Sequence, residues 1–441
     1  MKRDIDEYLV RWKDSPEHLP ILLRGARQVG KSYAVESFGK QYFQSFVVVN
    51  FEFQPELKSC FETLDPKKII PLIELLTNSN IIPGKTLLFL DEIQECPNAI
   101  MALRYFKEKL PELHVISAGS LLEFVLNSND FRMPVGRIQF YFLKPLSFKE
   151  YLSGLHHEKL RDFIESVSLK DGIPEAVHTQ LLQLVKEYCV LGGMPAVLNT
   201  FMETNSMRQA QDRQSVILTT YKSDFGKYAA KVSVELMQKI FNKAPSLVTK
   251  QLKYVEISRE IQAREIKNAL SKLVHANILY QVQSTSASGL PLGATVNPKK
   301  FKLLFLDTGL VERTTRLEAE TLLQNNLLLI NQGAIAEQFV GQELLAYSDP
   351  LIEPEVYFWE RDKKNASAEV DYVINNGGNV IPIEVKSGSA GRLKSIQMFL
   401  KEKNYPFGIK ISSSPMELHK NILSLPLYLT SEVGRLTKVL S

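Results

Sequence analysis

The sequence predicts a multidomain α/β protein that begins with a parallel sheet and continues with helical and mixed segments. Three observations predict this fold class. Short apolar runs alternate with helical runs over the first 155 residues, which is typical of a parallel sheet covered by helices. A glycine-rich turn joins an early strand to a helix, and a second group of strands follows residue 325.

Length and composition limit the class of protein. The chain has 441 residues, enough for roughly three domains. Hydrophobic residues make up 44% and charged residues 23%, as in soluble globular proteins. No apolar run approaches the ~20 residues of a membrane span, and the N-terminus has no apolar signal core. Three cysteines lack metal-ligand spacing. We therefore expect a cytoplasmic protein with no membrane partner.

The first predicted strand, Leu19–Arg24, leads into the motif G-x-x-x-x-G-K-[ST]. Gly25 and Gly30 allow a tight turn that brings backbone N–H groups to phosphate oxygens, and the following helix adds its N-terminal N–H groups. Lys31 can reach the β and γ phosphates, and the Ser32 hydroxyl can bind Mg²⁺. This predicts that the chain binds ATP with Mg²⁺. The predicted phosphate loop comprises Gly25, Ala26, Arg27, Gln28, Val29, Gly30, Lys31 and Ser32.

Two acidic residues end the buried strand that begins at Thr86. Open α/β sheets bind ligands at the carboxyl ends of their strands, so these acids should lie beside the phosphate loop. Asp91 is then a candidate for holding the Mg²⁺ shell, and Glu92 for orienting and deprotonating the attacking water. Another strand, Ser45–Glu52, intervenes in sequence between the loop and the acids. The extra strand and the adjacent Glu indicate the additional-strand, catalytic-glutamate branch of P-loop ATPases.

The next strand, His114–Ser120, ends in small polar residues. Ser120 is the first candidate for a hydroxyl that senses the γ-phosphate, and Ser117 is the second. The alternative is that Ser120 caps a following helix, with Glu123 completing a capping box.

Two arginines that follow are candidates for contact with the γ-phosphate. Arg137 is preferred over Arg132, and it could act within its own subunit or on a neighbour. Arginine suits this role because its charge is permanent and its donors are forked. A surface ion pair is the alternative interpretation of Arg137.

These motifs resemble a widespread group of prokaryotic AAA-type ATPases that carry a C-terminal domain of unknown function, the DUF4143 type. The resemblance rests on four runs and extends over nearly the whole chain: Leu23–Ser32, Leu90–Gln94, Ala118–Leu122 and Pro145–Tyr151. It implies an AAA-type ATPase domain over residues 1–155. A helical lid or connector would follow over residues 156–238, and it includes the Gly-Gly-Met-Pro element at Gly192–Pro195 that is typical of the family.

Residues 239–315 show the order helix, helix, helix, β-ribbon, which predicts a winged-helix domain. From Lys239 to Lys302 there are eleven Lys and Arg against three Glu, a local net charge of +8. Such a segment suggests a polyanion partner, and the third helix of this fold can enter a DNA major groove. Arg264, Lys267 and Lys272 would make the contacts. A solvated basic face, or a structural or protein-binding winged helix, is the alternative.

Residues 325–441 resemble the PD-(D/E)XK nuclease core. Asp371 lies on one predicted strand, and Glu384 and Lys386 share one face of the next, because residues i and i+2 of a strand point the same way. Glu337 lies on a preceding helix. The three acids could hold Mg²⁺, and Lys386 could position water. The alternative is a relic core kept for folding or binding.

The sequence therefore predicts Mg²⁺-dependent ATP binding and hydrolysis used as a conformational switch, coupled to nucleic-acid binding by the C-terminal half. An ATP-gated metal-dependent DNA nuclease is one alternative. A protein-binding regulatory ATPase with an inactive nuclease fold is the other. Beyond ATP and DNA, a homo-oligomer or a protein partner is expected.

Overall fold

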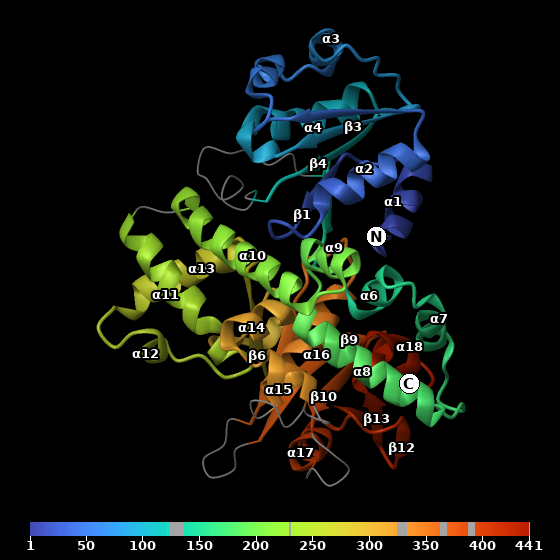
Figure 1. Ribbon diagram of the computed structural model, residues 1–441, viewed down its shortest axis with the longest axis vertical. Helices are drawn as coiled ribbons and strands as arrows, with labels where there is room; N and C mark the ends of the chain where they lie inside the picture. The colour runs from blue at the N-terminus through green and yellow to red at the C-terminus, as the bar shows by residue number, and fades with distance from the viewer. Residues whose placement is uncertain are drawn as a thin grey trace. The chain divides into compact units, whose positions relative to one another are not determined.

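The computed structural model describes residues 1–120, 122, 136–228, 231–323, 333–361, 368–386 and 393–440. It divides the chain into two compact units (Figure 1). Unit 1 consists of Met1–Lys144 and Ser348–Pro354, and unit 2 consists of Pro145–Tyr347 and Glu355–Ser441. Unit 1 thus ends before residue 155, and the segments predicted as lid, winged helix and nuclease-like domain all contribute to unit 2.

Unit 1 is built on a parallel sheet of five strands in the order β2-β3-β4-β1-β5. The strands are β1 (Ile21–Arg24), β2 (Ser45–Asn50), β3 (Thr86–Asp91), β4 (His114–Ala118) and β5 (Gln139–Phe142). The helices are α1 (Ile5–Asp14), α2 (Lys31–Tyr42), η1 (Pro55–Phe61), α3 (Pro66–Thr77), η2 (Ile93–Glu95) and α4 (Pro97–Lys109). The predicted alternation of strands and helices is confirmed.

The strand order explains how the loop and the acids meet. β4 lies between β1, which leads into the phosphate loop, and β3, which ends at Asp91. β2, the strand that intervenes in sequence, lies instead at the edge of the sheet. The additional strand is therefore β4, and the expectation that placed β2 in this role was wrong, because neighbours in sequence need not be neighbours in a sheet.

One face of this sheet forms a closed apolar core. Leu22, Val49, Leu90 and Val115 point from four strands into a cluster that also contains buried residues of α3, α4 and η1. Side chains alternate between the two faces of a strand, so every second residue of these near-continuous apolar runs faces this cluster. Burial on both faces is the reason that β3 and β4 are buried throughout.

Unit 2 begins with helices. They are α6 (Phe148–Gly154), α7 (Glu158–Ser166), α8 (Glu175–Leu191), α9 (Pro195–Thr204), α10 (Met207–Tyr228), α11 (Lys231–Leu247), α12 (Tyr254–Ile257) and α13 (Ala263–His275). Within the described residues, no single helix is long and apolar enough to cross a membrane. Only α8 and α9 taken together pass that test, and they bend by 115° at their junction.

An eight-stranded mixed sheet organises the rest of unit 2, in the order β12-β13-β11-β10-β9-β8-β6-β7. Its strands are β6 (Leu279–Thr285), β7 (Val296–Phe305), β8 (Val356–Glu360), β9 (Glu369–Asn376), β10 (Asn379–Val385), β11 (Gly408–Ser412), β12 (Glu417–His419) and β13 (Ile422–Pro426). The remaining elements are η3 (Leu292–Thr295), α14 (Thr308–Thr315), α15 (Glu318–Leu323), α16 (Ala334–Ala346), α17 (Lys394–Lys403), η5 (Leu427–Glu432) and α18 (Val433–Thr437).

The predicted wing strands do not stand apart from the nuclease-like segment. β6 and β7 form an antiparallel hairpin, and β6 also pairs in parallel with β8 through Val282 and Val356. The hairpin thus extends the sheet that carries β9 and β10. Residues on β7 therefore lie in the same sheet as Asp371 and Glu384.

Candidate functional site

The phosphate loop connects β1 to α2 as the motif predicts. Gly25 and Gly30 have positive φ angles of 145° and 92°, which disfavour side chains with a Cβ atom. A Cβ at Gly25 would also collide with the carbonyl oxygen of Leu143. α2 begins at Lys31, so the first N–H groups of the helix border the loop.

Lys31 is held within the loop itself. Its Nζ donates hydrogen bonds to the carbonyl oxygens of Gly25 at 2.9 Å and Ala26 at 2.8 Å, and the side chain is buried. Burial lowers the pKa of Lys31 to about 8, against the opposing effect of Glu92 and Asp91. Among the described residues, the hydrogen-bond partners of this buried ammonium are two carbonyl oxygens, so the ammonium is suited to bind a phosphate, because an anion would replace the solvation it lacks.

Ser32, the last residue of the phosphate loop, contacts Asp91, the last residue of β3. The Ser32 hydroxyl lies 3.2 and 3.0 Å from the two carboxylate oxygens of Asp91. Asn50, at the end of β2, donates to the same carboxylate from Nδ2 at 3.1 Å. Burial and the nearby Glu92 raise the pKa of Asp91, while the Ser32 hydrogen bond opposes that rise.

This pair fits the Mg²⁺ that a phosphate loop implies. A hydroxyl and a buried carboxylate are hard oxygen donors, and a divalent cation would relieve the desolvation of Asp91. Ser32 and Asp91 would hold the ion, and the ion would neutralise charge on the phosphates. Lys31, Ser32, Asp91 and the loop are therefore brought together as predicted.

Glu92 follows β3 directly and adopts a left-handed conformation, with φ 49° and ψ 45°. Its carboxylate Oε2 accepts a hydrogen bond from Gln94 Nε2 at 2.6 Å. Gly119 leaves the space for Gln94, because a Cβ there would collide with the amide oxygen of that side chain. The structure places Glu92 at the strand end beside Asp91, and its role as base remains a prediction.

The sensor candidates differ in their surroundings. The Ser117 hydroxyl is buried and donates to the carbonyl oxygen of Ile21 at 2.8 Å, so it is committed to the backbone of β1. Ser120 is buried just after β4, between the strand ends that carry the loop and the acids. The predicted capping partner Glu123 lies outside the described residues. Ser120 remains the candidate.

Arg137 forms the ion pair that was its alternative interpretation. Its Nε lies 3.3 Å from the carboxylate of Glu108, near the end of α4, and its side chain is half exposed. This geometry supports no phosphate contact and leaves the predicted role untested. Arg132 lies outside the described residues.

Sequence reasoning missed three residues that support this site. Asn50 pairs in register with Asp91, but this contact depends on β2 lying next to β3, which the local sequence does not indicate. Gln94 carried no signal beyond its closeness to Glu92. Arg3 donates from its guanidinium to the carbonyl oxygens of Val29 at 2.9 Å and Lys144 at 2.7 Å, so it fastens the loop from outside the motif.

The predicted nuclease-like residues also come together, within unit 2. Glu337 lies on α16, Asp371 on β9 and Glu384 on β10, and Lys386 follows β10. The Lys386 ammonium lies 3.1 Å from Glu384 Oε1. Asp371 Oδ2 accepts the backbone N–H of Val385 at 2.8 Å. The predicted strand spacing is therefore reproduced.

A lysine that was not predicted for this site lies among these acids. Lys302, on β7, places its Nζ 3.1 Å from Glu337, 2.6 Å from Glu369 and 3.8 Å from Asp371. Although burial opposes it, the three carboxylates raise the pKa of Lys302. Burial raises the pKa of Glu337 and of Glu384. Across the described part of the chain, no group of three or more His, Cys, Asp or Glu is arranged to hold a metal ion.

The predicted DNA-contacting residues lie on α13. Arg264 and Lys267 are exposed, whereas Ile266 and Leu270 of the same helix are buried. Lys272 donates instead to the Ser233 hydroxyl at 3.1 Å. Exposure of two of the three is compatible with a phosphate contact and does not establish one.

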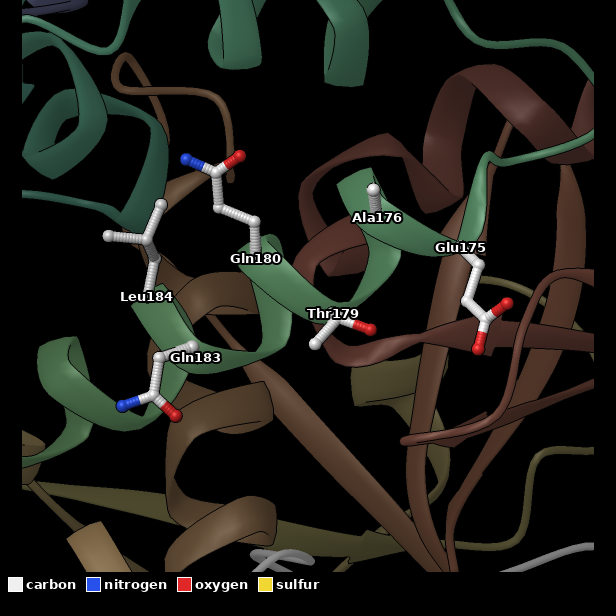
Figure 2. A pocket seen from close by; sticks show the side chains of 6 residues that line it. All are labelled: Glu175, Ala176, Thr179, Gln180, Gln183 and Leu184. Atoms are coloured by element: carbon white, nitrogen blue, oxygen red, sulfur yellow. The ribbon is translucent and has the colours of Figure 1, made fainter.

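A surface depression lies on α8, apart from the predicted site residues. Its lining side chains all come from this one helix (Figure 2). They are Glu175, Ala176, Thr179, Gln180, Gln183 and Leu184. These lining residues include one acid and no base, so they offer no catalytic arrangement.

Comparison with known protein families confirms the AAA and DUF4143 parts of the resemblance. Residues 17–152 match the AAA domain family, and residues 332–428 match a domain of unknown function, DUF4143. The segment between them, residues 182–321, matches a second domain of unknown function, DUF8612. No curated protein sequence matches the chain.

Solved structures with similar folds include the ORC2 protein of Aeropyrum pernix, which is 12% identical over 72% of this chain and 91% of that one, with a TM-score of 0.34. The Holliday junction branch migration motor RuvB of Thermotoga maritima is 12% identical over 63% and 89%, with a TM-score of 0.29. Drosophila ORC bound to DNA is 13% identical over 71% and 85%, with a TM-score of 0.27. These values carry no conclusion about function. The matched families and the geometry of the phosphate loop identify the chain as an AAA-type P-loop ATPase with a C-terminal DUF4143 domain.

Proposed function

We propose that this ATPase uses Mg²⁺-dependent hydrolysis as a conformational switch that controls nucleic-acid binding by its C-terminal half. Lys31 binds phosphate, Ser32 and Asp91 bind Mg²⁺, and Glu92 activates the attacking water. The observation that carries the hydrolytic assignment is the direct contact of Ser32 with Asp91, next to a glutamate fixed by its own hydrogen bond.

The exposed basic residues of α13 support the nucleic-acid part. Arg264 and Lys267 are exposed on one helix, and no ion pair engages them within the described residues. α13 leads into β6, whose hairpin with β7 is continuous with the sheet of the DUF4143 segment. A movement of α13 on phosphate binding would therefore be passed through β6 to the sheet of unit 2.

Hydrolysis is tested with two substitutions. Lys31→Ala should abolish ATP binding. Glu92→Gln should leave binding intact and reduce turnover about a hundredfold or more, the range for loss of a general base. ATP affinity and steady-state phosphate release measure the two effects. Undiminished turnover in Glu92→Gln would refute the assignment of the base.

Nucleic-acid binding is tested by fluorescence anisotropy of a labelled DNA duplex at about 50 mM and about 200 mM salt, with and without ATP. Phosphate contacts release counterions, so affinity should fall steeply with salt. Arg264→Ala with Lys267→Ala should weaken binding and flatten the salt slope. The matched control, Lys67→Ala with Lys68→Ala, removes the same charge from exposed positions of α3. Equal binding by both double variants, or no salt-sensitive binding, would reject the proposal.

A second candidate, a protein-binding ATPase with an inactive nuclease fold, is favoured by one observation. The ammonium of Lys302 lies among the acids that a nuclease would use for its metal.

A further inference from the structure

Lys302 is the centre of a buried charge cluster formed by three elements of unit 2. Its side chain is 2% exposed and reaches from β7 to Glu337 on α16 and to Glu369 and Asp371 on β9. The ring of Phe358 on β8 lies below the ammonium, 5.2 Å from Nζ to the ring centroid. The ammonium therefore has anions around it and an aromatic face beneath it, a favourable environment for a resident cation.

The position of Lys302 is fixed by the sheet. Its residue pairs in register with Val282 of β6, and an isolated bridge joins it to Gln251. Leu303 and Leu304 follow it and are buried. A lysine at an exposed strand end could turn its head group to water. Lys302 lacks that freedom, because its backbone is held on both sides and its head group is buried.

The same carboxylates would be needed by a divalent cation. Mg²⁺ requires near-octahedral oxygen ligands at about 2.0–2.1 Å and retains several waters. Here Glu337 and Asp371 both face the ammonium, and their oxygens lie at hydrogen-bonding or longer distances from it. A metal ion between them would meet a positive charge in the same space. With Lys302 in place, these residues do not fit a metal.

We infer that Lys302 is the permanent cation of this carboxylate cluster, and that the DUF4143 domain of this chain holds no divalent metal between Glu337 and Asp371. The internal ammonium offsets part of the cost of burying these acids, because a buried charge without a partner is costlier than a paired one. Glu384 remains beside Lys386, and its second carboxylate oxygen has no partner among the described residues. The domain therefore lacks the ion that metal-dependent cleavage of a phosphodiester requires.

The experiment titrates the full-length, nucleotide-free chain with Mn²⁺ and measures binding by calorimetry and by the shift of the melting temperature. An Asp91→Asn background removes binding at the ATP site. In that background, the chain that keeps its native Lys302 should show no Mn²⁺ binding that depends on Asp371. Lys302→Met should gain about one site, and Mn²⁺ should raise its melting temperature, because a ligand that binds only the folded state stabilises it. Lys302→Arg keeps the charge and should gain none.

Two results would overturn the inference. One is that the chain with native Lys302 binds Mn²⁺ and that Asp371→Asn abolishes this binding. The other is a folded Lys302→Met that gains no site. If Lys302→Met does not fold, the inference is tested by Mn²⁺ binding to the chain with native Lys302, measured with and without Asp371→Asn. The outcome is independent of DNA binding by α13.

Discussion

Gln94 Nε2 donates a hydrogen bond of 2.6 Å to Glu92 Oε2, and this amide holds the carboxylate beside Asp91. The two residues flank Ile93 at the start of the short helix η2, where Glu92 adopts a left-handed conformation. The amide oxygen of Gln94 is buried without a partner among the described residues and lies against Gly119. A glycine after β4 and a glutamine after β3 thus together set the orientation of one carboxylate.

We predict that Gly119→Ala slows hydrolysis through Gln94. The new Cβ would displace the amide of Gln94 and break its bond to Glu92. Loss of one hydrogen bond to a charged group, about 1.5 kcal/mol, corresponds to roughly tenfold in kcat, with little change in KM for ATP. Steady-state kinetics measure both constants.

The control is Gly172→Ala, where a Cβ meets no atom within 4 Å. If the effect passes through Gln94, then Gly119→Ala should cost nothing further in a Gln94→Ala background. Additive losses in the double variant would show that Gly119 acts by another route, such as through Ser120.

The pKa of Lys31 predicts how stability depends on pH. Its pKa falls from 10.5 in the unfolded chain to about 8 in the folded one. Between these values the unfolded state binds more protons, so stability rises with pH, and this contribution is lost as pH falls through 8. The full depression corresponds to roughly 3 kcal/mol.

The measurement compares the unfolding free energy of the native chain with that of Lys31→Met from about pH 7 to about pH 10, by urea denaturation without nucleotide. The native chain should gain stability relative to the variant as the pH rises above 8. Other titrating groups are shared by both proteins and cancel. A constant difference across this range would contradict the depressed pKa.

The phosphate loop and the Asp91–Glu92 pair were predictable because local sequence determines them. A tight glycine turn and a strand end leave signatures within a few residues. The strand order was not predictable in the same way. β4 lies between β1 and β3 because of pairings between distant segments, and the edge position of β2 has no local signal.

Lys302 is a second feature that the sequence did not predict. In sequence it belongs to the basic segment that suggests a polyanion partner, with a solvated basic face as the alternative. In the structure, the pairing of β6 with β8 brings β7 to the carboxylates of β9 and α16, and the lysine is buried. Whether a charged residue is solvated or buried depends on contacts made elsewhere in the chain, which periodicity and composition do not record.

The Gly-Gly-Met-Pro element also gains a physical role, which yields the last prediction. Gly192 has φ 76° and ψ −175°, a region that residues other than glycine rarely adopt. Asp307 is buried beside it and accepts the N–H of Gly193 at 2.6 Å and of Leu310 at 3.1 Å. A Cβ at Gly192 would collide with that carboxylate.

Gly192→Ala should therefore destabilise unit 2 by about 3 kcal/mol or more, from backbone strain and from the displaced acceptor of buried N–H groups. Gly84→Ala is the control, since Gly84 also has φ 76° but has open space around it. In an Asp307→Ala background the collision is absent, so Gly192→Ala should cost only the backbone term. Chemical denaturation measures each variant. If Gly192→Ala costs no more than Gly84→Ala, the carboxylate of Asp307 is not what requires the glycine.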